Sequence, residues 1–314
     1  MALTLVEASK YSNDVLQQGV IETFVRDDPV AERMKFKTIL GNALSYNRET
    51  GEADAEFKAV NDTWTPTNQV VTKYTATLKI LGNAARIDDF IRSTRQNIND
   101  VRAEMIAGNA KAVKKAWGDG LIYGDGTADP KSFDGAHKLI ANTTYNTILA
   151  DATDTQTVVL SLSTHLDKAL DMVKGFRPAC IVTSKGLRRG VTKYLRSVGS
   201  INTGRDEFGH QIMTYGSNDV PWYASDYILD TELTASGAYS AKTGGLTTSI
   251  FILSFEEKAF EGLHARPMEV TPWETVPGTN VEESKIRWYV SLMMESLVSC
   301  VKIVGIDADG TVAA

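Results

Sequence analysis

The sequence has few of the residues on which covalent stability and catalysis usually depend. Only two of its 314 residues are cysteines, Cys180 and Cys300, and they lie far apart within apolar runs. A disulfide framework needs more of them, so buried free thiols in a reducing compartment are expected. The four histidines, which fall at no spacing typical of metal ligands, are His137, His165, His210 and His264. Because the G-x-S-x-G and paired-cysteine motifs are also absent, we predict no catalytic residue, no metal site and no cofactor.

Positive charge and long apolar runs are also scarce. Lysine and arginine number 33 against 39 acidic residues, and the net charge of −6 argues against a dedicated nucleic-acid reader, which needs a strongly basic face. The one stretch to consider as a membrane span, 288–306, carries Glu295 and Lys302 and therefore predicts two strands. The residues after Met1 have no basic lead, so no signal peptide is predicted. We expect a soluble cytoplasmic protein with one large domain or two ordinary ones.

The first 35 residues predict an N-terminal arm. Apolar residues between Val15 and Val25 form one helical stripe, which Pro29 stops. A short helix of this kind cannot hold itself in water, so we expect the arm to dock on another surface.

Two strand-like legs joined by a polar segment follow the arm. Lys37–Asn47 and Val70–Ile80 predict a two-stranded ribbon, with clear period-two alternation in the second leg. Between the legs, residues 49–62 hold five acidic residues and one lysine, which leaves four net negative charges. Isolated ribbons are marginal in water, so we interpret the ribbon as a clasp on a neighbouring subunit; a solvated hairpin tip is the alternative. The proposed acidic contacts are Glu52, Asp54 and Glu56.

A long amphipathic helix is predicted after the ribbon. Apolar residues at three-four spacing draw one stripe along roughly 45 Å of helix; they are Ile87, Ile91, Ile98, Val101, Met105 and Ala112. Basic residues outnumber acidic ones between positions 92 and 115. A solvated basic face is one interpretation, and a face toward packaged nucleic acid is the other.

The helix runs into a glycine-rich segment, GDGLIYGDGT at 118–127. Tyr123 stands where a dinucleotide-binding loop needs glycine, and the segment follows a helix rather than a strand. A calcium loop starting at Asp125 would have Ala136 at its twelfth position instead of glutamate. A structural turn is therefore predicted, with Gly120, Gly124 and Gly126 as its glycines.

Residues 151–261 alternate between helix and strand patterns. Cys180–Thr183 predicts a short buried strand, and Ser184 predicts the cap of a helix whose apolar face contains Leu187, Val191 and Leu195. The basic residues Arg189, Lys193 and Arg196 share another face of that helix. A solvated face is the simpler interpretation, and a docking surface for an acidic neighbour, with the acidic ribbon tip as a candidate, is the other.

The order of these elements resembles the major capsid proteins of tailed bacteriophages, the Johnson fold first known from phage Hong Kong 97. The local matches are Ala116–Ile140, with GLIYGDGT; Ala179–Ser197; and FILSFEEKAFEGLHARPMEV at 251–270. The resemblance implies an α+β fold with an N-terminal arm (1–35), an extended β-ribbon loop (36–82), a peripheral domain with a long spine helix (83–150 and 262–314) and an α/β axial domain (151–261).

The resemblance also implies a function and partners. The chain is expected to be a structural protein, not an enzyme, that self-assembles into hexamers and pentamers of an icosahedral shell around double-stranded DNA. Expected partners are a portal, a decoration protein and the DNA, packaged on the inner face without sequence recognition. The virion capsid is the expected location, after assembly in the host cytoplasm. Because the chain begins at Met1 without a long helical segment, scaffolding is expected to be a separate protein.

Two other functions stay open on the sequence. An encapsulin-like cargo compartment would use the same fold, and cargo-loading sequences on neighbouring proteins would favour it. A soluble α/β enzyme using the glycine-rich turn is the third hypothesis, and the missing ligand residues count against it.

Overall fold

The computed structural model describes residues 30, 33–51, 53–89, 98–140, 145–149, 159–199, 201–205, 211–216, 218–235, 238–308 and 312–313. Four features of the sequence analysis lie outside these residues: the apolar stripe of the N-terminal arm, Glu52, Ile91 and His210. Among the helices of the described part, none is both long and apolar enough to cross a membrane.

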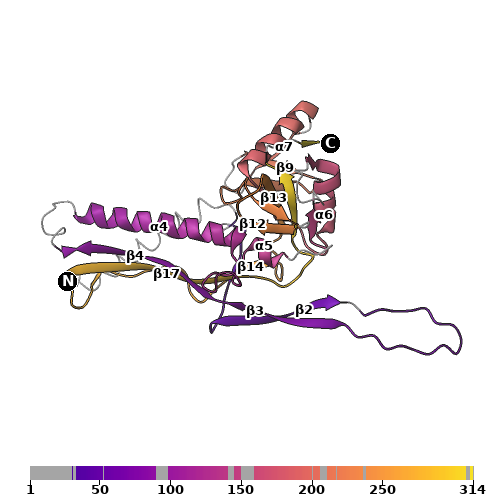
Figure 1. Ribbon diagram of the computed structural model, residues 1–314, viewed down its shortest axis with the longest axis horizontal. Helices are drawn as coiled ribbons and strands as arrows, with labels where there is room; N and C mark the ends of the chain where they lie inside the picture. The colour runs from indigo at the N-terminus through magenta and orange to yellow at the C-terminus, as the bar shows by residue number, and fades with distance from the viewer. Residues whose placement is uncertain are drawn as a thin grey trace.

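A long helix and two long strands form the elongated half of the molecule. Helix α4 (Ile98–Tyr123) lies along β4 (Lys79–Asp88) and β17 (Val281–Met294), as Figure 1 shows. Its 26 residues correspond to about 39 Å. The side chains on its buried face follow the three-four spacing of a helix, and they are Ile106, Ala110, Val113, Trp117 and Leu121.

The structure corrects both the start of this helix and its apolar stripe. Ile87 lies in strand β4, where it is paired with Glu282 of β17. This pairing continues through ten residue pairs, from Asp88 to Lys79, and such an extended ladder outweighs the local helical pattern. Met105 was expected in the buried stripe but is 39% exposed, and its neighbour Ile106 is buried instead.

Strand β17 is the centre of a six-stranded sheet that supports the helix. It pairs antiparallel with β4, β14, β15 and β16, while β1 runs parallel to β14. The remaining strands are β1 (Phe36–Thr38), β14 (Phe260–His264), β15 (Glu269–Val270) and β16 (Glu274–Thr275). Trp117 of α4 packs on Trp288 of β17 with their ring centroids 4.8 Å apart, so this aromatic pair joins the helix to the sheet.

A seven-stranded sheet organises the other half of the molecule. Its order is β5 (Thr147–Leu149), β18 (Val301–Asp307), β13 (Thr247–Leu253), β7 (Cys180–Thr183), β10 (Val220–Ala224), β9 (Gln211–Tyr215) and β8 (Asn202–Arg205). The predicted buried strand at 180–183 is confirmed, and the two strands predicted within 288–306 are present as parts of β17 and β18. Strand β18 was grouped with residues 262–314 on the sequence, but it pairs with β13, which lies in the segment 151–261. The sequence did not predict this pairing, because the alternation of a strand does not identify its partner.

Helices and short hairpins surround this sheet. Helix α7 (Lys185–Val198) begins at Ser184, whose Oγ accepts a hydrogen bond of 3.3 Å from the backbone N–H of Leu187, as predicted. The other elements are α5 (Ala136–Leu139), the π-helix η1 (Leu162–Asp167), α6 (Lys168–Met172), and the pairs β6 (Leu160–Ser161) with β19 (Val312–Ala313) and β11 (Leu233–Ala235) with β12 (Ala238–Ala241). Cys180 and Cys300 are buried free thiols, as expected.

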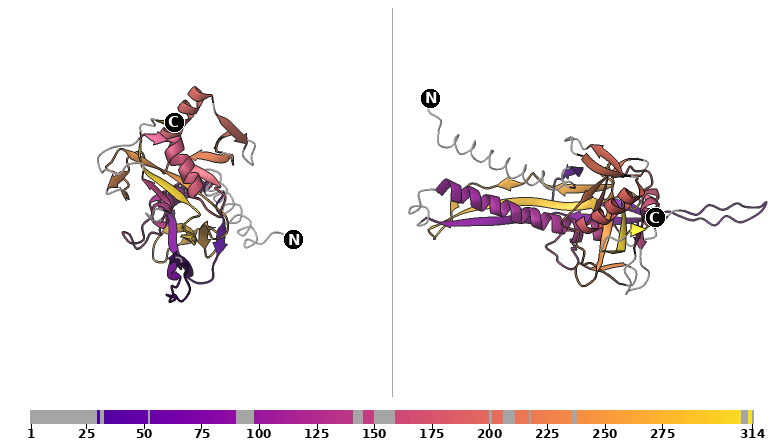
Figure 2. Two further views of the ribbon diagram at one scale, coloured as in Figure 1. Left: turned by 90° about the vertical axis from the view of Figure 1, so that its right-hand side faces the viewer. Right: turned by 90° about the horizontal axis from the view of Figure 1, so that it is seen from above.

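The ribbon projects from the body between the two halves. Strands β2 (Ala43–Gly51) and β3 (Val70–Thr77) pair antiparallel, and the segment that joins them reaches far beyond the rest of the chain (Figures 1 and 2). The expected legs ran from 37 to 47 and from 70 to 80. The structure instead places β1 and β4, at the outer ends of those ranges, in the six-stranded sheet.

Candidate functional site

The tip of the ribbon is a shaped segment with exposed apolar side chains. Phe57, Val60 and Trp64 are all exposed. A turn closes the tip, where Asn61 has a φ of 73° and the Asp62 carboxylate accepts a hydrogen bond of 2.8 Å from the Ala59 N–H. Large apolar side chains exposed along a projecting arm are typical of a contact surface.

The acidic residues of the tip lie beside these apolar side chains. Asp54 and Glu56 are exposed, and Glu56 forms an ion pair with Lys58. The backbone carbonyl of Asp54 accepts a hydrogen bond of 2.8 Å from Thr67 Oγ1, which joins the two sides of the connecting segment. The tip therefore presents carboxylates and aromatic rings together.

Arg48 anchors the root of the ribbon. Its side chain is buried, and its Nε donates a hydrogen bond of 3.0 Å to the carbonyl oxygen of Glu295, while an N–H of the same guanidinium reaches the carbonyl of Met294. The phenol of Tyr46 lies in the same region, where burial raises its pKa. The buried guanidinium of Arg48 therefore holds strand β2 of the ribbon against the end of β17 by hydrogen bonds.

The three basic residues predicted on one face of α7 do lie together. Arg189, Lys193 and Arg196 line a groove of about 480 Å³ with Arg188, Thr192 and Met213. Lys185, at the start of the helix, is paired with Asp226 and lies outside the groove lining. Sequence reasoning missed Arg188 as a member and Met213 as the apolar wall, because β9, which carries Met213, is joined to α7 only through the tertiary fold.

The acidic tip and the basic groove lie far apart within one chain. In Figure 1, the ribbon extends away from the body at its lower side, whereas α7 lies at the upper end of the seven-stranded sheet. The structure therefore does not bring Asp54 and Glu56 to Arg189, Lys193 and Arg196 within a single subunit.

The glycine-rich segment forms a tight crossing rather than a ligand loop. Gly120 lies inside α4, not in the turn, and a Cβ there would meet the Phe133 ring at 3.0 Å. A Cβ at Gly124 would lie 2.3 Å from the carbonyl oxygen of Phe133. Neither Gly124 nor Gly126 has a positive φ, so close backbone approach, and not left-handed geometry, is what requires glycine at 124.

The carboxylate of Asp125 is engaged by neighbouring groups of the glycine-rich segment. Its Oδ1 accepts a hydrogen bond of 2.8 Å from the Thr127 N–H and lies 3.1 Å from Lys138 Nζ. Although burial acts to raise it, these contacts lower the pKa of the Asp125 carboxyl. Among the residues that the structure describes, no three His, Cys, Asp or Glu side chains are grouped to hold a metal ion.

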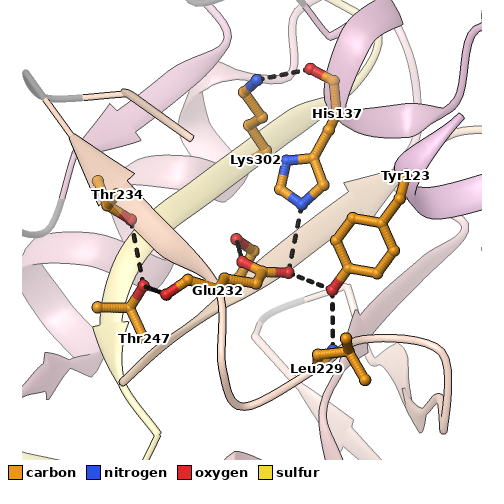
Figure 3. Close-up of polar contacts among 8 residues, drawn as sticks. Tyr123, His137, Leu229, Glu232, Thr234, Thr247 and Lys302 are labelled. Atoms are coloured by element: carbon orange, nitrogen blue, oxygen red, sulfur yellow. Dashed lines mark hydrogen bonds and ion pairs between the residues drawn. The ribbon is translucent and has the colours of Figure 1, made fainter. Parts of the chain in front are cut away.

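A buried polar cluster, shown in Figure 3, joins the end of α4 to the seven-stranded sheet. Its centre is Glu232, only 1% exposed, which accepts hydrogen bonds from the Tyr123 hydroxyl at 2.5 Å and from the Ser249 hydroxyl. His137 Nε2 lies 3.3 Å from the same carboxylate. Lys302 Nζ donates a hydrogen bond of 2.8 Å to the carbonyl oxygen of His137.

Burial dominates the electrostatics of this cluster. It lowers the pKa of His137, against the opposing effect of Glu232, and raises the pKa of the Tyr123 hydroxyl. It also lowers the pKa of Lys302 to about 8. Glu232 contacts Tyr123, His137 and Ser249, which come from separate elements, so the cluster ties those elements together. His137 Nδ1 is buried without a hydrogen-bond partner in the described part of the chain. Sequence reasoning had one signal for the cluster, the lysine at 302 within an apolar strand, and none for Glu232.

Several solved structures have a similar architecture. The chain is similar to the holo-SrpI encapsulin complex from Synechococcus elongatus PCC 7942, with a TM-score of 0.65, 13% identity and 91% of each chain covered. It is also similar to the capsid of a native GTA particle, with a TM-score of 0.56, 10% identity, and 88% of this chain and 89% of that one covered. Mycobacterium phage Ogopogo gives a TM-score of 0.53 and 13% identity over 88% of this chain and 91% of that one.

No protein-family model matches the sequence, and the comparison with curated proteins finds no match either. The structural likeness shows the fold: this chain has the mixed α+β, Hong Kong 97-type major capsid fold.

Proposed function

We propose that this chain is a structural, non-enzymatic major capsid protein of a tailed phage, which self-assembles into an icosahedral shell around double-stranded DNA. The observation that carries the proposal is the ribbon: its root is held by buried Arg48, and its tip exposes Phe57 and Trp64. Such an arm buries its apolar side chains only against another molecule. In a closed symmetric shell, each subunit offers both the arm and a surface for a neighbour's arm.

The proposed division of labour follows the sheets. The six-stranded sheet and α4 form the peripheral domain, and the seven-stranded sheet, including β18, forms the axial domain at the capsomer centre. The arm (1–35) and the extended loop (36–82), whose projecting part is 43–77, make contacts between subunits. Portal, scaffolding and decoration proteins are the expected partners in the host cytoplasm, and the DNA lies on the inner face of the capsid without sequence recognition.

A ribbon deletion tests the shell function. Replacing residues 49–68 by a short turn removes the tip but leaves Arg48 and most of β2 and β3 in place. We expect a folded subunit that forms no shells under conditions where the full chain does, as seen by electron microscopy. Regular closed shells of the deletion variant would contradict the proposal.

An encapsulin-like cargo compartment is the second candidate, and the similarity to an encapsulin over most of the chain favours it. The two candidates differ in what assembly needs and what is enclosed. Uniform shells that form from the chain alone and take up a protein cargo would favour the compartment. Shells that need a co-expressed scaffolding protein and then package DNA would favour the capsid.

A further inference from the structure

We propose that the groove along α7 receives the acidic, aromatic ribbon tip of a second copy of this chain. The proposal rests on the proposed shell function and names the surface that the ribbon engages. It begins with an imbalance of charge. Helix α7 carries five basic residues and no acidic one, although the whole chain has a net charge of −6.

The groove cations have no acidic partner among the residues that the structure describes. Arg188, Arg189, Lys193 and Arg196 are exposed, while the opposite face of the helix is buried in the core. Arg189 and Lys193 are four residues apart, and like charges at this spacing repel each other in a helix. This repulsion is not offset by an acidic residue of α7, and four cations gathered on one surface suit an anionic ligand.

The composition of the groove specifies the ligand further. Three of its four cations are arginines, whose planar guanidinium groups bind carboxylates through two hydrogen bonds and also stack on aromatic rings. Met213 supplies a thioether wall, which makes favourable contacts with aromatic rings. A segment with carboxylates and aromatic side chains side by side fits this lining.

The ribbon tip is such a segment. Asp54 and Glu56 are exposed beside Phe57, and Trp64 is exposed on the returning side of the tip. The turn at Asn61 and the Thr67 hydrogen bond give the tip its shape before it meets a partner, which reduces the entropy lost on docking. Because the ribbon root is fixed and the tip projects away from α7 (Figure 1), the groove of the same chain is out of reach and a second copy must supply it.

Nucleic acid is the competing anion, and the structure favours it less. The groove cations span nine residues of helix, with about 12 Å between the first and the last, which accommodates only a few phosphates. The net charge of −6 repels a long polyanion outside that patch. A short acidic segment needs no more than the groove itself.

A charge exchange between the two surfaces tests the proposal. One variant combines Arg189→Glu, Lys193→Glu and Arg196→Glu; the other combines Glu52→Lys, Asp54→Lys and Glu56→Lys. We expect each to raise the concentration needed for half-maximal shell formation by about tenfold or more, and the variant with all six changes to return to within about threefold of the wild type. Lys111→Glu and Glu257→Lys, at exposed positions elsewhere, serve as controls and should change little.

Peptide binding supplies a measurement that does not depend on shells. A synthetic peptide of residues 49–68 is titrated into the full-length chain held below its assembly concentration. We expect saturable, salt-sensitive binding that the groove triple variant loses and the Lys111→Glu control retains.

Several outcomes would overturn the proposal. If the variant with all six substitutions is as defective in shell formation as the worse of the two triple variants, direct contact between the two surfaces is excluded. A groove variant that assembles normally but loses co-purified DNA would assign the groove to nucleic acid. If the ribbon deletion abolishes shells while the groove variant assembles and binds the peptide normally, the shell function stands and this inference fails. A wild-type chain that forms no shells contradicts the shell function, and peptide binding then decides the fate of the groove by itself.

Discussion

The guanidinium of Arg48 lies over the ring of Tyr74, with its central carbon 4.3 Å from the ring centroid. The two residues belong to the two strands of the ribbon, and the same guanidinium donates hydrogen bonds to backbone carbonyls at the end of β17. One side chain therefore closes the ribbon upon itself and joins it to the body. A cation held against an aromatic face in a partly desolvated site contributes more than an exposed pair does.

Replacing this arginine tests the anchor. Arg48→Met removes the hydrogen bonds to Glu295 and Met294 but keeps an unbranched side chain over Tyr74. We expect a loss of about 1.5–3 kcal/mol in the free energy of unfolding, as for hydrogen bonds to a charged group, measured by denaturant titration. Lys73→Met, at an exposed position of β3, should stay within about 0.5 kcal/mol. Equal losses in the two variants would contradict the anchoring role.

Neighbouring residues of the long helix should respond in opposite ways. Ile106 is buried, and Ile106→Ala should lower the free energy of unfolding by about 2–5 kcal/mol. Met105 is 39% exposed, so Met105→Ala should cost about 0.5 kcal/mol or less. Thermal melts of the two variants give the order directly, and a larger loss for Met105→Ala would place the helix in a different rotation.

The crossing after the long helix should distinguish two of its glycines. A Cβ at Gly124 would overlap the carbonyl oxygen of Phe133, whereas at Gly126 the nearest atom, the Ser132 oxygen, is 3.2 Å away. We expect Gly124→Ala to lower the free energy of unfolding by about 3 kcal/mol or more, and Gly126→Ala by about 1 kcal/mol or less. Comparable stabilities of the two variants in a denaturant titration would show that the crossing can relax.

The buried cluster should make stability depend on pH. Burial lowers the pKa of His137 in the folded state below its ordinary value of about 6.5, so the unfolded state binds more protons as the pH falls through that value. The contribution of the neutral ring is therefore complete above about pH 6.5 and is lost below it. Unfolding measured between pH 7.5 and 5 should show a smaller slope for His137→Gln than for the wild type.

His165 supplies the matched control for this pH dependence. Burial and the nearby Lys168 lower its pKa as well, but its ring is less enclosed. His165→Gln should leave most of the slope in place. If it removes as much of the slope as His137→Gln does, the cluster is not the main source of the pH dependence.

Local signals in the sequence were sufficient for some elements. The strand at 180–183, the Ser184 cap and the buried face of α7 all depend on residues close together in the chain, and the structure has them as predicted. The hairpin of β9 and β10 around Gly216 likewise depends on contacts between residues close together in the chain.

Contacts between distant parts of the chain could not be predicted from the sequence. Ile87 fits a helical stripe locally, but its partner Glu282 in β17 is almost two hundred residues away and assigns it to a strand. The carboxylate of Glu232 is surrounded by Tyr123, His137 and Ser249, which come from separate elements. Likewise, nothing near Arg48 in the sequence shows that it contacts carbonyls at 294 and 295. Such pairings depend on the topology, which the local pattern does not specify.

The strands before and after the ribbon are both hydrogen-bonded into the six-stranded sheet, which has a mechanical consequence. Strand β1 before it lies in register with β14, and strand β4 after it is paired with β17 through ten residue pairs. A pull on the tip along the ribbon therefore loads those hydrogen bonds side by side, in shear, instead of opening them one at a time from an end. A force on the tip is therefore transmitted directly to the six-stranded sheet that packs against α4, and many hydrogen bonds carry it together.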